Sequence, residues 1–319
     1  MGEIGTHDSL GLLVVSLVIG VVIGLTGMGG GALMTPALIT LGIPPTAAVA
    51  NDLVVNAVNK IVGGAVHLRH GKPDLRIAGW LVLGSVPTSY AGAWLVHAVG
   101  ADDVQGLLKK AIGVTLLVAA AAYVLRSWLE LTGRITQGGD DTDPPVRPLP
   151  TFLVGVVGGL MVGITSVGSG TVIMMCIMLL YPTLSALRLV GTDLVQAIPL
   201  VIAAAIGHVM VTGVDWALLW PLLLGGSVGT LLGARFASRV PDGLVRRGIS
   251  MVLCLTGIAM LKIVPDQYLL FIAGAMLIFG PAGWNMVRRH YGAEVRPGPL
   301  ARTREHLRTP PAADDDYVI

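Results

Sequence analysis

Two long stretches of this chain carry no charged side chain and no histidine. The first runs from Leu10 to Asn51 and the second from Thr151 to Leu187, and neither contains Asp, Glu, Lys, Arg or His. A helix needs about 20 apolar residues to cross a bilayer. Only 13% of the 319 residues are charged, well below the level typical of soluble domains, and the mean hydropathy is +0.78. The sequence therefore predicts an all-α, polytopic membrane protein embedded in the lipid bilayer.

The rest of the composition excludes several classes of protein. The net charge of +2 comes from short clusters between apolar runs, which orient a membrane protein, so we expect no nucleic acid partner. Cys176 and Cys254 both lie in apolar segments and are interpreted as small buried thiols, so we expect no metal site. The N-terminal apolar run lacks a basic leader and an A-x-A cleavage site, and we expect it to remain as a membrane segment.

The centre of each uncharged stretch is rich in glycine. The two motifs are GLTGMGGGALMTP at Gly24–Pro36 and GITSVGSGTVIMM at Gly163–Met175. After the first break, Gly31–Leu41 is long enough to reach only about half way across a bilayer, at about 1.5 Å per residue. Each motif therefore predicts a re-entrant helical hairpin or a broken helix, and such backbone survives at membrane depth only where protein or water satisfies it.

One fragment of the first motif resembles a nucleotide-binding fingerprint. Gly27–Ala32 fits G-x-G-x-x-A, but no strand precedes it and no βαβ unit surrounds it. It is not a phosphate-binding P-loop either, because no Gly-Lys-Ser/Thr follows. We expect no cofactor and no ATP-driven chemistry, which leaves a secondary transporter as the default.

Further helices are expected over Thr46–Leu68, Leu75–Val99 and Lys109–Arg126. A polar segment over 130–150, with GGDDTDPP at its centre, then separates two halves of the chain. The second half repeats the first, with Gly20–Ala32 matching Gly159–Thr171. Further pairs follow in the same order: Asp52-Leu53-Val54 with Asp193-Leu194-Val195, His67 with His208, Asp74 with Asp215, Gly84-Ser85-Val86 with Gly226-Ser227-Val228, and Lys109-Lys110 with Arg246-Arg247.

So many matches in one order indicate an internal duplication. We expect a first membrane repeat at 1–129, a polar cytoplasmic linker at 130–150 and a second membrane repeat at 151–264. The apolar segment Gln267–Val287 has no counterpart, and we expect it to form an extra C-terminal transmembrane helix within 265–287. The polar tail over 288–319 is expected to be disordered and cytoplasmic.

The basic residues predict that the two repeats are inverted. Cytoplasmic loops are enriched in Lys and Arg, and corresponding loops of the two halves differ in this respect. In this arrangement each half has one hairpin plus three transmembrane helices, and the two hairpin tips meet near the midplane. If each broken element crosses once instead, the repeats are parallel. One loop of the first half contains Arg69, Lys72 and Arg76, whereas the matching loop of the second half, 211–215, contains no basic residue. In the second half the basic residues come one loop later, at Arg235, Arg239, Arg246 and Arg247.

The two glycine-rich breaks are candidates for an anion site. Half-helices opening at Ala32 and Thr171 would present free N–H groups and partial positive charge to a ligand. The alternative is that the glycines only permit close helix packing. The candidate residues are Thr26, Gly27, Gly29, Gly30 and Gly31 in the first break and Thr165, Ser166, Gly168, Ser169 and Gly170 in the second.

A polar stripe on the next helix adds a cation to this candidate site. Asp52, Asn56, Asn59 and Lys60 recur at helical spacing, and ionisable groups at this depth face a cavity or a partner. Lys60 could attract an anion, and Asp52 could be its counter-ion or carry a proton or a cation. A structural Asp–Lys pair is the alternative. The matching helix offers Thr192, Asp193 and Gln196, with Val201 in place of Lys60, and Asp193 is a second candidate for ion coupling.

Two other readings involve histidine. His67 and His208 lie near helix ends and are interpreted as interfacial side chains rather than as a proton relay. Ser169 and His208 could instead form the dyad of an intramembrane hydrolase. Against that, the residue that matches Ser169 is Gly30, and no G-x-S-x-G motif surrounds the serine. We therefore do not expect an enzyme.

The same residues resemble a known family. GLTGMGGGALMTPAL with LGIPPTAAVA, then VGTDLVQAIPL and HVMVTGVDWALL, are similar to the TauE/SafE sulfite exporter family of membrane permeases over roughly 10–264. The resemblance implies a prokaryotic inner-membrane protein of about seven to nine segments that transports sulfite, sulfonates such as sulfoacetate or taurine, or related anions. We expect a secondary transporter of such an anion with its site between the repeats, and another small anion such as a carboxylate as the alternative. A homo-oligomer is compatible with this reading.

Overall fold

The computed structural model describes residues 6–26, 31–68, 73–99, 101–132, 144–236, 242–269 and 271–276, together with residues 280, 284 and 286. The chain divides into two compact units, Met1–Met276 and Leu277–Ile319, and the first contains the helices discussed below. No strand occurs in the described part of the chain, so the all-helical prediction is confirmed there.

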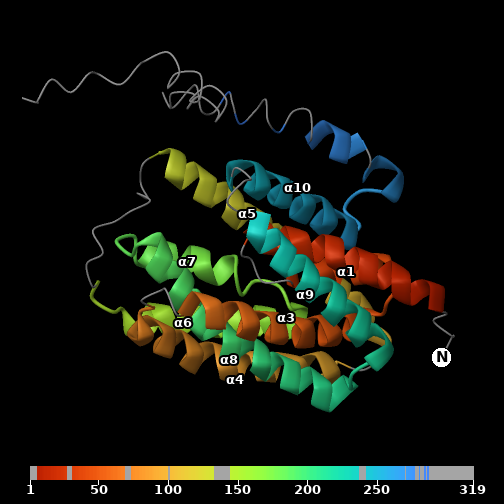
Figure 1. Ribbon diagram of the computed structural model, residues 1–319, viewed down its shortest axis with the longest axis horizontal. Coiled ribbons are helices and arrows are strands. Elements are labelled where there is room, and N and C mark those ends of the chain that lie inside the picture. Colours follow the sequence, from red (N-terminus) through yellow and green to blue (C-terminus); the bar gives the residue numbers. More distant parts are fainter. Residues whose placement is uncertain are drawn as a thin grey trace, which may run out of the picture. The chain divides into compact units, whose positions relative to one another are not determined.

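The described helices form two consecutive sets with the same order: a long helix, a short helix and three long helices (Figure 1). This shared order agrees with the predicted duplication. The first set is α1 (Thr6–Thr26), α2 (Gly31–Thr40), α3 (Pro45–Leu68), α4 (Leu75–Ala98) and α5 (Ala101–Leu131). The second set is α6 (Pro148–Thr165), α7 (Val172–Leu180), α8 (Ala186–Thr212), α9 (Trp216–Phe236) and α10 (Asp242–Met260), followed by a 3₁₀ turn at Asp266–Tyr268.

A short helix follows each glycine-rich break, as expected. Helix α2 has 10 residues and α7 has 9, so each is about half the length needed to cross a bilayer. Helix α2 begins at Gly31, one residue before the predicted start, and α7 has Thr171 at its N-cap position. Residues 27–30 of the first break lie outside the described part of the chain.

Two predicted boundaries are wrong. Helix α5 has 31 residues and is much longer than the predicted Lys109–Arg126, because Val104 and Leu108 continue the buried apolar face of Ile112. It also extends into the predicted linker. Helix α6 begins at Pro148, before the predicted start of the second repeat, since proline fits the first turn of a helix. Linker residues 133–143 lie outside the described part of the chain.

The predicted C-terminal transmembrane helix is described only in part. Its beginning contains the 3₁₀ turn, and residues 271–276 are helical. From residue 277 onward only isolated residues are described, and the predicted disordered tail over 288–319 lies outside them. The extra helix and the tail therefore stay predictions.

The apolar helices match a protein that crosses a membrane several times. By length and composition, four described helical segments can span a bilayer, and three shorter apolar segments accompany them. Large apolar side chains such as Val14, Val157 and Leu231 are exposed on these helices, where lipid can cover them. The four long segments are Val104–Leu129, Pro148–Thr165, Arg188–Thr212 and Trp216–Phe236, and the shorter ones are Ser9–Leu25, Gly31–Thr40 and Arg247–Met260.

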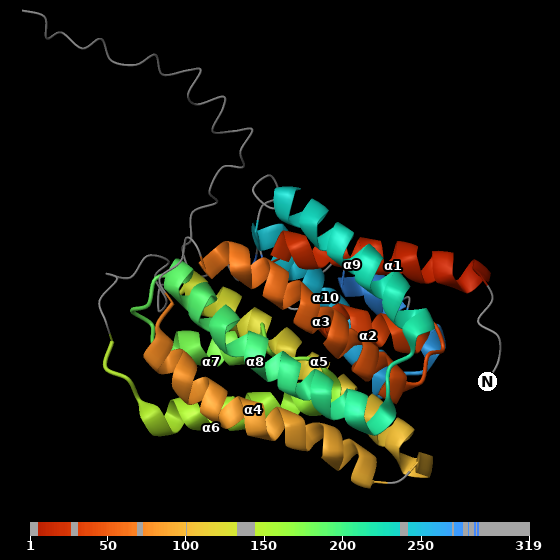
Figure 2. The same ribbon diagram turned by 60° about the horizontal axis from the view of Figure 1, so that its bottom comes forward.

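The first helix of each half packs against the other half. Helix α1 lies against α9 along most of its length (Figure 2). A Cβ atom at Gly225 would lie 2.5 Å from the Leu13 carbonyl oxygen, and one at Gly233 would lie 2.9 Å from the Leu25 nitrogen. The two helices therefore run parallel, with their backbones close enough to exclude side chains.

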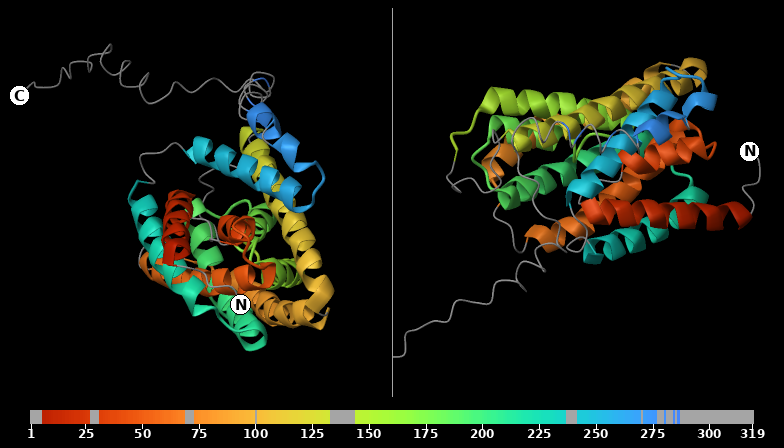
Figure 3. Two further views of the ribbon diagram at one scale, coloured as in Figure 1. Left: turned by 90° about the vertical axis from the view of Figure 1, so that its right-hand side faces the viewer. Right: turned by 90° about the horizontal axis from the view of Figure 1, so that it is seen from above.

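Helix α6 makes the matching contact with α4. A Cβ atom at Gly155 would lie 2.5 Å from the Leu81 carbonyl oxygen, and one at Gly163 would lie 2.7 Å from Ser89 Cα. These helices also run parallel. The halves thus exchange their first helices, and the α1–α9 pair lies on the flank opposite α5 (Figure 3, left). The glycine-packing alternative is therefore correct for the helical glycines of α1 and α6.

Helix α4 also lies beside α8, and the two share a direction. The backbone N–H of Asp74, just before α4, donates to Thr192 Oγ1 at 2.9 Å, near the start of α8. Further along, Ser89 Oγ donates to the Leu200 carbonyl oxygen at 3.1 Å. Together with the close contact between α3 and α8, this places the polar faces of the third helices at the centre of the molecule.

Candidate functional site

The two glycine-rich breaks touch each other. A Cβ atom at Gly31, the first residue of α2, would overlap the carbonyl group of Ser166. Ser166 is the C-cap residue of α6 and adopts a left-handed conformation, with φ 63°. Gly27, Gly29 and Gly30 lie outside the described residues, and so does the side chain of Thr26. The described ends of the two breaks therefore form one contact between the halves.

The second break is a tightly hydrogen-bonded turn. Gly168 has φ 116°, a conformation that favours glycine, and its carbonyl oxygen accepts the N–H groups of Thr171 at 3.4 Å, Val172 at 3.1 Å and Ile173 at 3.3 Å. Thr165 Oγ1 accepts the Val167 N–H at 3.2 Å and closes the other side of the turn. The sequence predicts that these N–H groups at the start of α7 bind an anion, but in the structure they are already hydrogen-bonded within the turn.

Polar atoms nevertheless remain in this turn. Ser169 is buried, and the Thr171 hydroxyl is buried with no hydrogen-bond partner in the part of the chain that the structure describes. Gly170 lies between them and is partly exposed. The turn therefore keeps unsatisfied polar capacity even though its first helical N–H groups are occupied.

A buried carboxylate joins both breaks. Asp52, on α3, accepts a hydrogen bond from Thr35 Oγ1 at 2.6 Å and one from Ser166 Oγ at 2.8 Å, both on Oδ2. Its other oxygen, Oδ1, is buried and has no hydrogen-bond partner among the described residues. Thr35 comes from α2 and Ser166 from the turn after α6, so Asp52 links a helix, a half-helix and a turn from both halves.

A second buried carboxylate lies near a buried lysine. Lys60 on α3 is 7% exposed and Asp193 on α8 is 3% exposed. The two side chains are near enough for the charge of each to act on the other. Gln196 Nε2 donates to Asp193 Oδ1 at 3.0 Å, and no described residue binds the buried Gln196 Oε1. Opposite charges and an unsatisfied amide oxygen therefore meet where α3 and α8 pack together.

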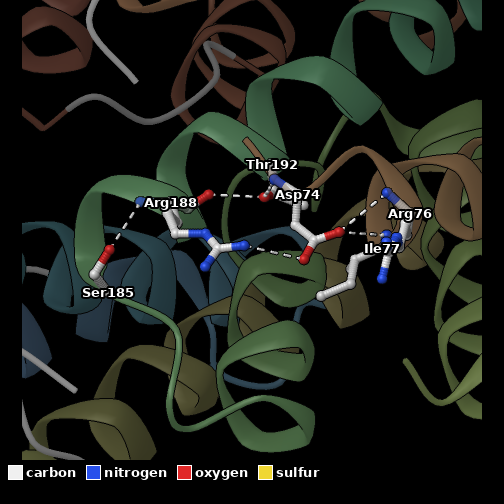
Figure 4. Close-up of polar contacts among 6 residues, drawn as sticks. All are labelled: Asp74, Arg76, Ile77, Ser185, Arg188 and Thr192. Carbon is white, nitrogen blue, oxygen red and sulfur yellow. Dashed lines mark hydrogen bonds and ion pairs between the residues drawn. The ribbon is translucent and has the colours of Figure 1, made fainter. Parts of the chain in front are cut away.

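Other predicted site residues have partners on neighbouring helices. Asn56 is buried on α3, whereas Asn59 Oδ1 accepts a hydrogen bond from Ser227 Oγ of α9 at 2.8 Å. Thr192 Oγ1 donates to the Arg188 carbonyl oxygen at 2.7 Å and accepts from the Asp74 N–H, so its hydroxyl serves the α4–α8 contact (Figure 4). The structure brings Asp52, Lys60 and Asp193 to the centre and ties Asn59 and Thr192 to helix packing.

The interfacial interpretation of His208 is wrong. Its side chain is 1% exposed, and Nε2 lies 2.7 Å from the Gly163 carbonyl oxygen on α6, so its ring joins two helices. The side chain of His67 is not described. The Nε2 atom that a hydrolase dyad would direct at Ser169 is occupied by the Gly163 carbonyl. Nothing in the described geometry favours the hydrolase.

The sequence analysis does not predict three of the contacts in and around this site. Thr35 carries no signal of its own, although it follows the first break directly and is fully buried. Ser227 and the Asp74–Arg188 ion pair are also missed, because their partners lie far away in the sequence. Asp74 and Ser227 do have a signal, since they match Asp215 and Ser85 in the repeat alignment.

Comparison with known proteins gives one consistent result. A family model described as "Sulfite exporter TauE/SafE" matches residues 12–260. The probable membrane transporter protein YjnA of Bacillus subtilis is 35% identical over 233 residues, which cover 72% of this chain and 91% of the relative. The probable membrane transporter protein YdhB of the same organism is 26% identical over 255 residues, or 78% of this chain and 99% of the relative. No solved structure gives a significant match.

Proposed function

This chain belongs to the TauE/SafE sulfite exporter family and is a multi-pass membrane transporter, and we propose that it moves a small anion by secondary transport. Sulfite or an organosulfonate is the favoured substrate, because the family description names sulfite. Another small anion, such as a carboxylate, is the alternative. The observation that carries the anion preference is the buried Lys60 at the contact between the two halves.

The proposed substrate site lies between α3 and α8. A lysine this deep in a membrane protein is costly unless it has a partner, and intramembrane cations of this kind line substrate pathways. Asp193 offsets the Lys60 charge, and an anion can share that cation with it. Among the described residues, Thr171 Oγ1 in the second break and Gln196 Oε1 on α8 have no hydrogen-bond partner and mark further polar capacity. The remaining predicted contacts of the two breaks belong to this proposal: Thr26, Gly27, Gly29, Gly30 and Gly31, and Thr165, Ser166, Gly168, Ser169 and Gly170.

The two halves are proposed to be inverted repeats. Helices α4 and α8 run parallel, as do α4 with α6 and α1 with α9. Each third helix and the helix after it run in opposite directions, α3 against α4 and α8 against α9 (Figure 2). It follows that the equivalent helices α3 and α8 point in opposite directions, and so do α1 and α6. These directions support alternating access around a fixed central site.

The same directions support re-entrant hairpins. Helix α2 packs against α3 through Thr35 and Asp52 and joins it by a short turn, so these two run antiparallel. Helix α2 therefore runs antiparallel to α1, and by the same argument α7 runs antiparallel to α6.

Cysteine labelling tests the inversion. A cysteine introduced at Asp242 should be shielded from membrane-impermeant reagent added outside, and one at Asp103 should be labelled. Labelling of Asp242→Cys from outside would overturn the inversion.

Ion coupling is proposed to use a buried carboxylate, Asp52 or Asp193. Both lie at the centre, at equivalent positions of the two halves. We place the protein in a prokaryotic plasma membrane with the C-terminal tail in the cytoplasm, on the charge pattern and the bacterial relatives. A homo-oligomer remains part of this proposal.

Flux measurements test the proposal directly. Purified protein in proteoliposomes is given sulfite, taurine, acetate and sulfate in turn, with protein-free liposomes as the control. We expect flux of sulfite or of a sulfonate above the control, and loss of that flux in Lys60→Met. Flux of acetate alone would favour the alternative, and no flux of any anion would contradict the proposed function.

A further inference from the structure

We propose that Thr35, Asp52 and Ser166 form a binding site for a monovalent cation, a proton or Na⁺, and that Asp193 is the fixed counter-ion of Lys60. This inference rests on the proposed transport function and deepens it, because it assigns the two equivalent carboxylates to different tasks. Its central observation is the buried Oδ1 atom of Asp52, which has no partner among the described residues.

The two carboxylates differ in how their charge is balanced. Asp193 has the Lys60 ammonium nearby and a hydrogen bond from Gln196. Asp52 receives hydrogen bonds from the hydroxyl groups of Thr35 and Ser166, and within the described part of the chain its surroundings supply no opposite charge. The repeat counterpart of Lys60 is Val201. A lysine there would balance Asp52 as Lys60 balances Asp193, but valine is apolar.

An ionised carboxylate at 1% exposure without a counter-ion is costly in a membrane protein. A bound cation removes that cost. The ligands at hand are a carboxylate and two hydroxyl groups, which are oxygen donors of the kind that hard cations prefer. A proton on Oδ1 would satisfy the same atom.

The position of the site explains how such a cation could be coupled to movement. Its ligands come from α2, from α3 and from the turn after α6, so both halves contribute. Gly31 packs directly on Ser166, which keeps these ligands together. A rocking motion of one half against the other separates Ser166 from Asp52 and dismantles the site. Occupancy of the cation site therefore favours the arrangement seen here.

Na⁺ binding can be measured without knowing the transported anion. The thermal unfolding of purified wild-type protein is followed in NaCl and in choline chloride, alongside Asp52→Asn, Thr35→Val and Asp193→Asn. If Na⁺ binds, we expect a rise in Tm with NaCl that is lost in Asp52→Asn, reduced in Thr35→Val and kept in Asp193→Asn. If the cation is a proton, NaCl has no effect, and a pH gradient drives anion accumulation in wild type but not in Asp52→Asn.

Two results would overturn this assignment: a NaCl effect lost only in Asp193→Asn, or neither cation producing an effect that depends on Asp52. Both leave the proposed function standing if wild-type protein still carries the anion. An Na⁺-dependent rise in Tm without flux of any anion would instead contradict the proposed function and support the cation site.

A separate set of contacts around Asp74, outside the central site, joins the two halves. Asp74 accepts the N–H groups of Arg76 at 3.0 Å and Ile77 at 3.2 Å, which caps α4, and its Oδ2 pairs with Arg188 Nη2 at 3.3 Å (Figure 4). Its own N–H donates to Thr192 on the same helix as Arg188. Both charged side chains are largely buried, at 8% and 13% exposure. The starts of α4 and α8, from different halves, are thus joined.

The equivalent position in the other half lacks this connection. Asp215 precedes α9 and accepts the Ala217 N–H at 3.0 Å, but it is exposed. The residue that matches Arg188 is Ala47, which carries no charge. We infer that the Asp74–Arg188 pair is a latch that holds the halves together at one end, and that transport requires it to open.

A disulfide beside the latch tests this inference. A Cβ atom at Gly191 would lie 3.5 Å from Pro73 Cβ, which suits a disulfide and leaves Asp74, Arg188 and Thr192 intact. We expect Pro73→Cys/Gly191→Cys to lose transport on oxidation and to regain it with reductant, while either single variant responds to neither. Oxidised protein that transports as fast as the reduced protein would show that this contact never opens and would overturn the latch.

Discussion

The two halves of this transporter share a backbone plan and differ in charge. Asp52 and Asp193 occupy equivalent positions, yet Asp52 has two hydroxyl partners and Asp193 has Lys60 and Gln196. The helices around them follow the same exchange, α1 with α9 and α6 with α4. Duplication therefore supplied a symmetric frame, in which single side chains then gave the two carboxylates different surroundings.

The largest effect is expected at Lys60. Lys60→Met leaves Asp193 as a buried charge without its cation, which costs about 3–5 kcal/mol, and it also removes the proposed anion contact. We expect a much lower Tm and no anion flux. The double variant Lys60→Met/Asp193→Asn should recover the Tm but not the flux. Recovery of flux in the double variant would show that Lys60 serves only as a structural partner of Asp193.

The symmetric frame predicts equal effects at equivalent glycines. A Cβ atom at Gly20 would lie 2.5 Å from the Gly226 carbonyl oxygen, and one at Gly159 would lie 2.6 Å from Ser85 Cα. Gly20→Ala and Gly159→Ala should each destabilise the protein by about 1–3 kcal/mol in a denaturant titration. Gly11→Ala is the control, because no heavy atom lies within 4 Å of its added Cβ. A large difference between the first two variants would contradict the symmetry of the frame.

The smallest effect separates two equivalent serines. Ser227 Oγ donates to Asn59 Oδ1 at 2.8 Å, whereas the buried hydroxyl of Ser85 has no partner within the described ranges. Ser227→Ala should therefore cost about 0.6 kcal/mol, the typical value of a hydrogen bond between membrane helices. Ser85→Ala should be neutral or slightly stabilising, since it removes an unsatisfied polar group. Equal losses of Tm in the two variants would contradict this assignment.

Much of the architecture can be predicted from local patterns. The uncharged runs indicate membrane helices, and the spacing of Gly31–Leu41 indicates a half-length helix after the first break. The internal repeat alone pairs Asp52 with Asp193, because both precede the same Leu-Val dipeptide. Helix ends are less predictable: α5 begins eight residues before Lys109, because Val104 and Leu108 extend its buried apolar face.

The charged residues of the candidate site can be predicted from the sequence, but their contact partners cannot. Asp52, Lys60 and Asp193 stand out because ionisable groups are rare in apolar segments. Their partners do not, since Ser166 lies 114 residues from Asp52 and Ser227 lies 168 residues from Asn59. A pair of Asp52 with Lys60 is one of the alternatives that the sequence leaves open. In the structure Thr35 and Ser166 bind Asp52, and the charge that acts on Lys60 is that of Asp193.

Local patterns in the sequence establish a duplicated helical membrane protein with two glycine-rich breaks, because hydropathy, glycine content and internal repetition are properties of neighbouring residues. Which charges face each other is a property of the tertiary structure alone. It depends on helices exchanged between halves and on a turn at Ser166 reaching Asp52, contacts whose strength comes from burial and distance rather than from any local pattern.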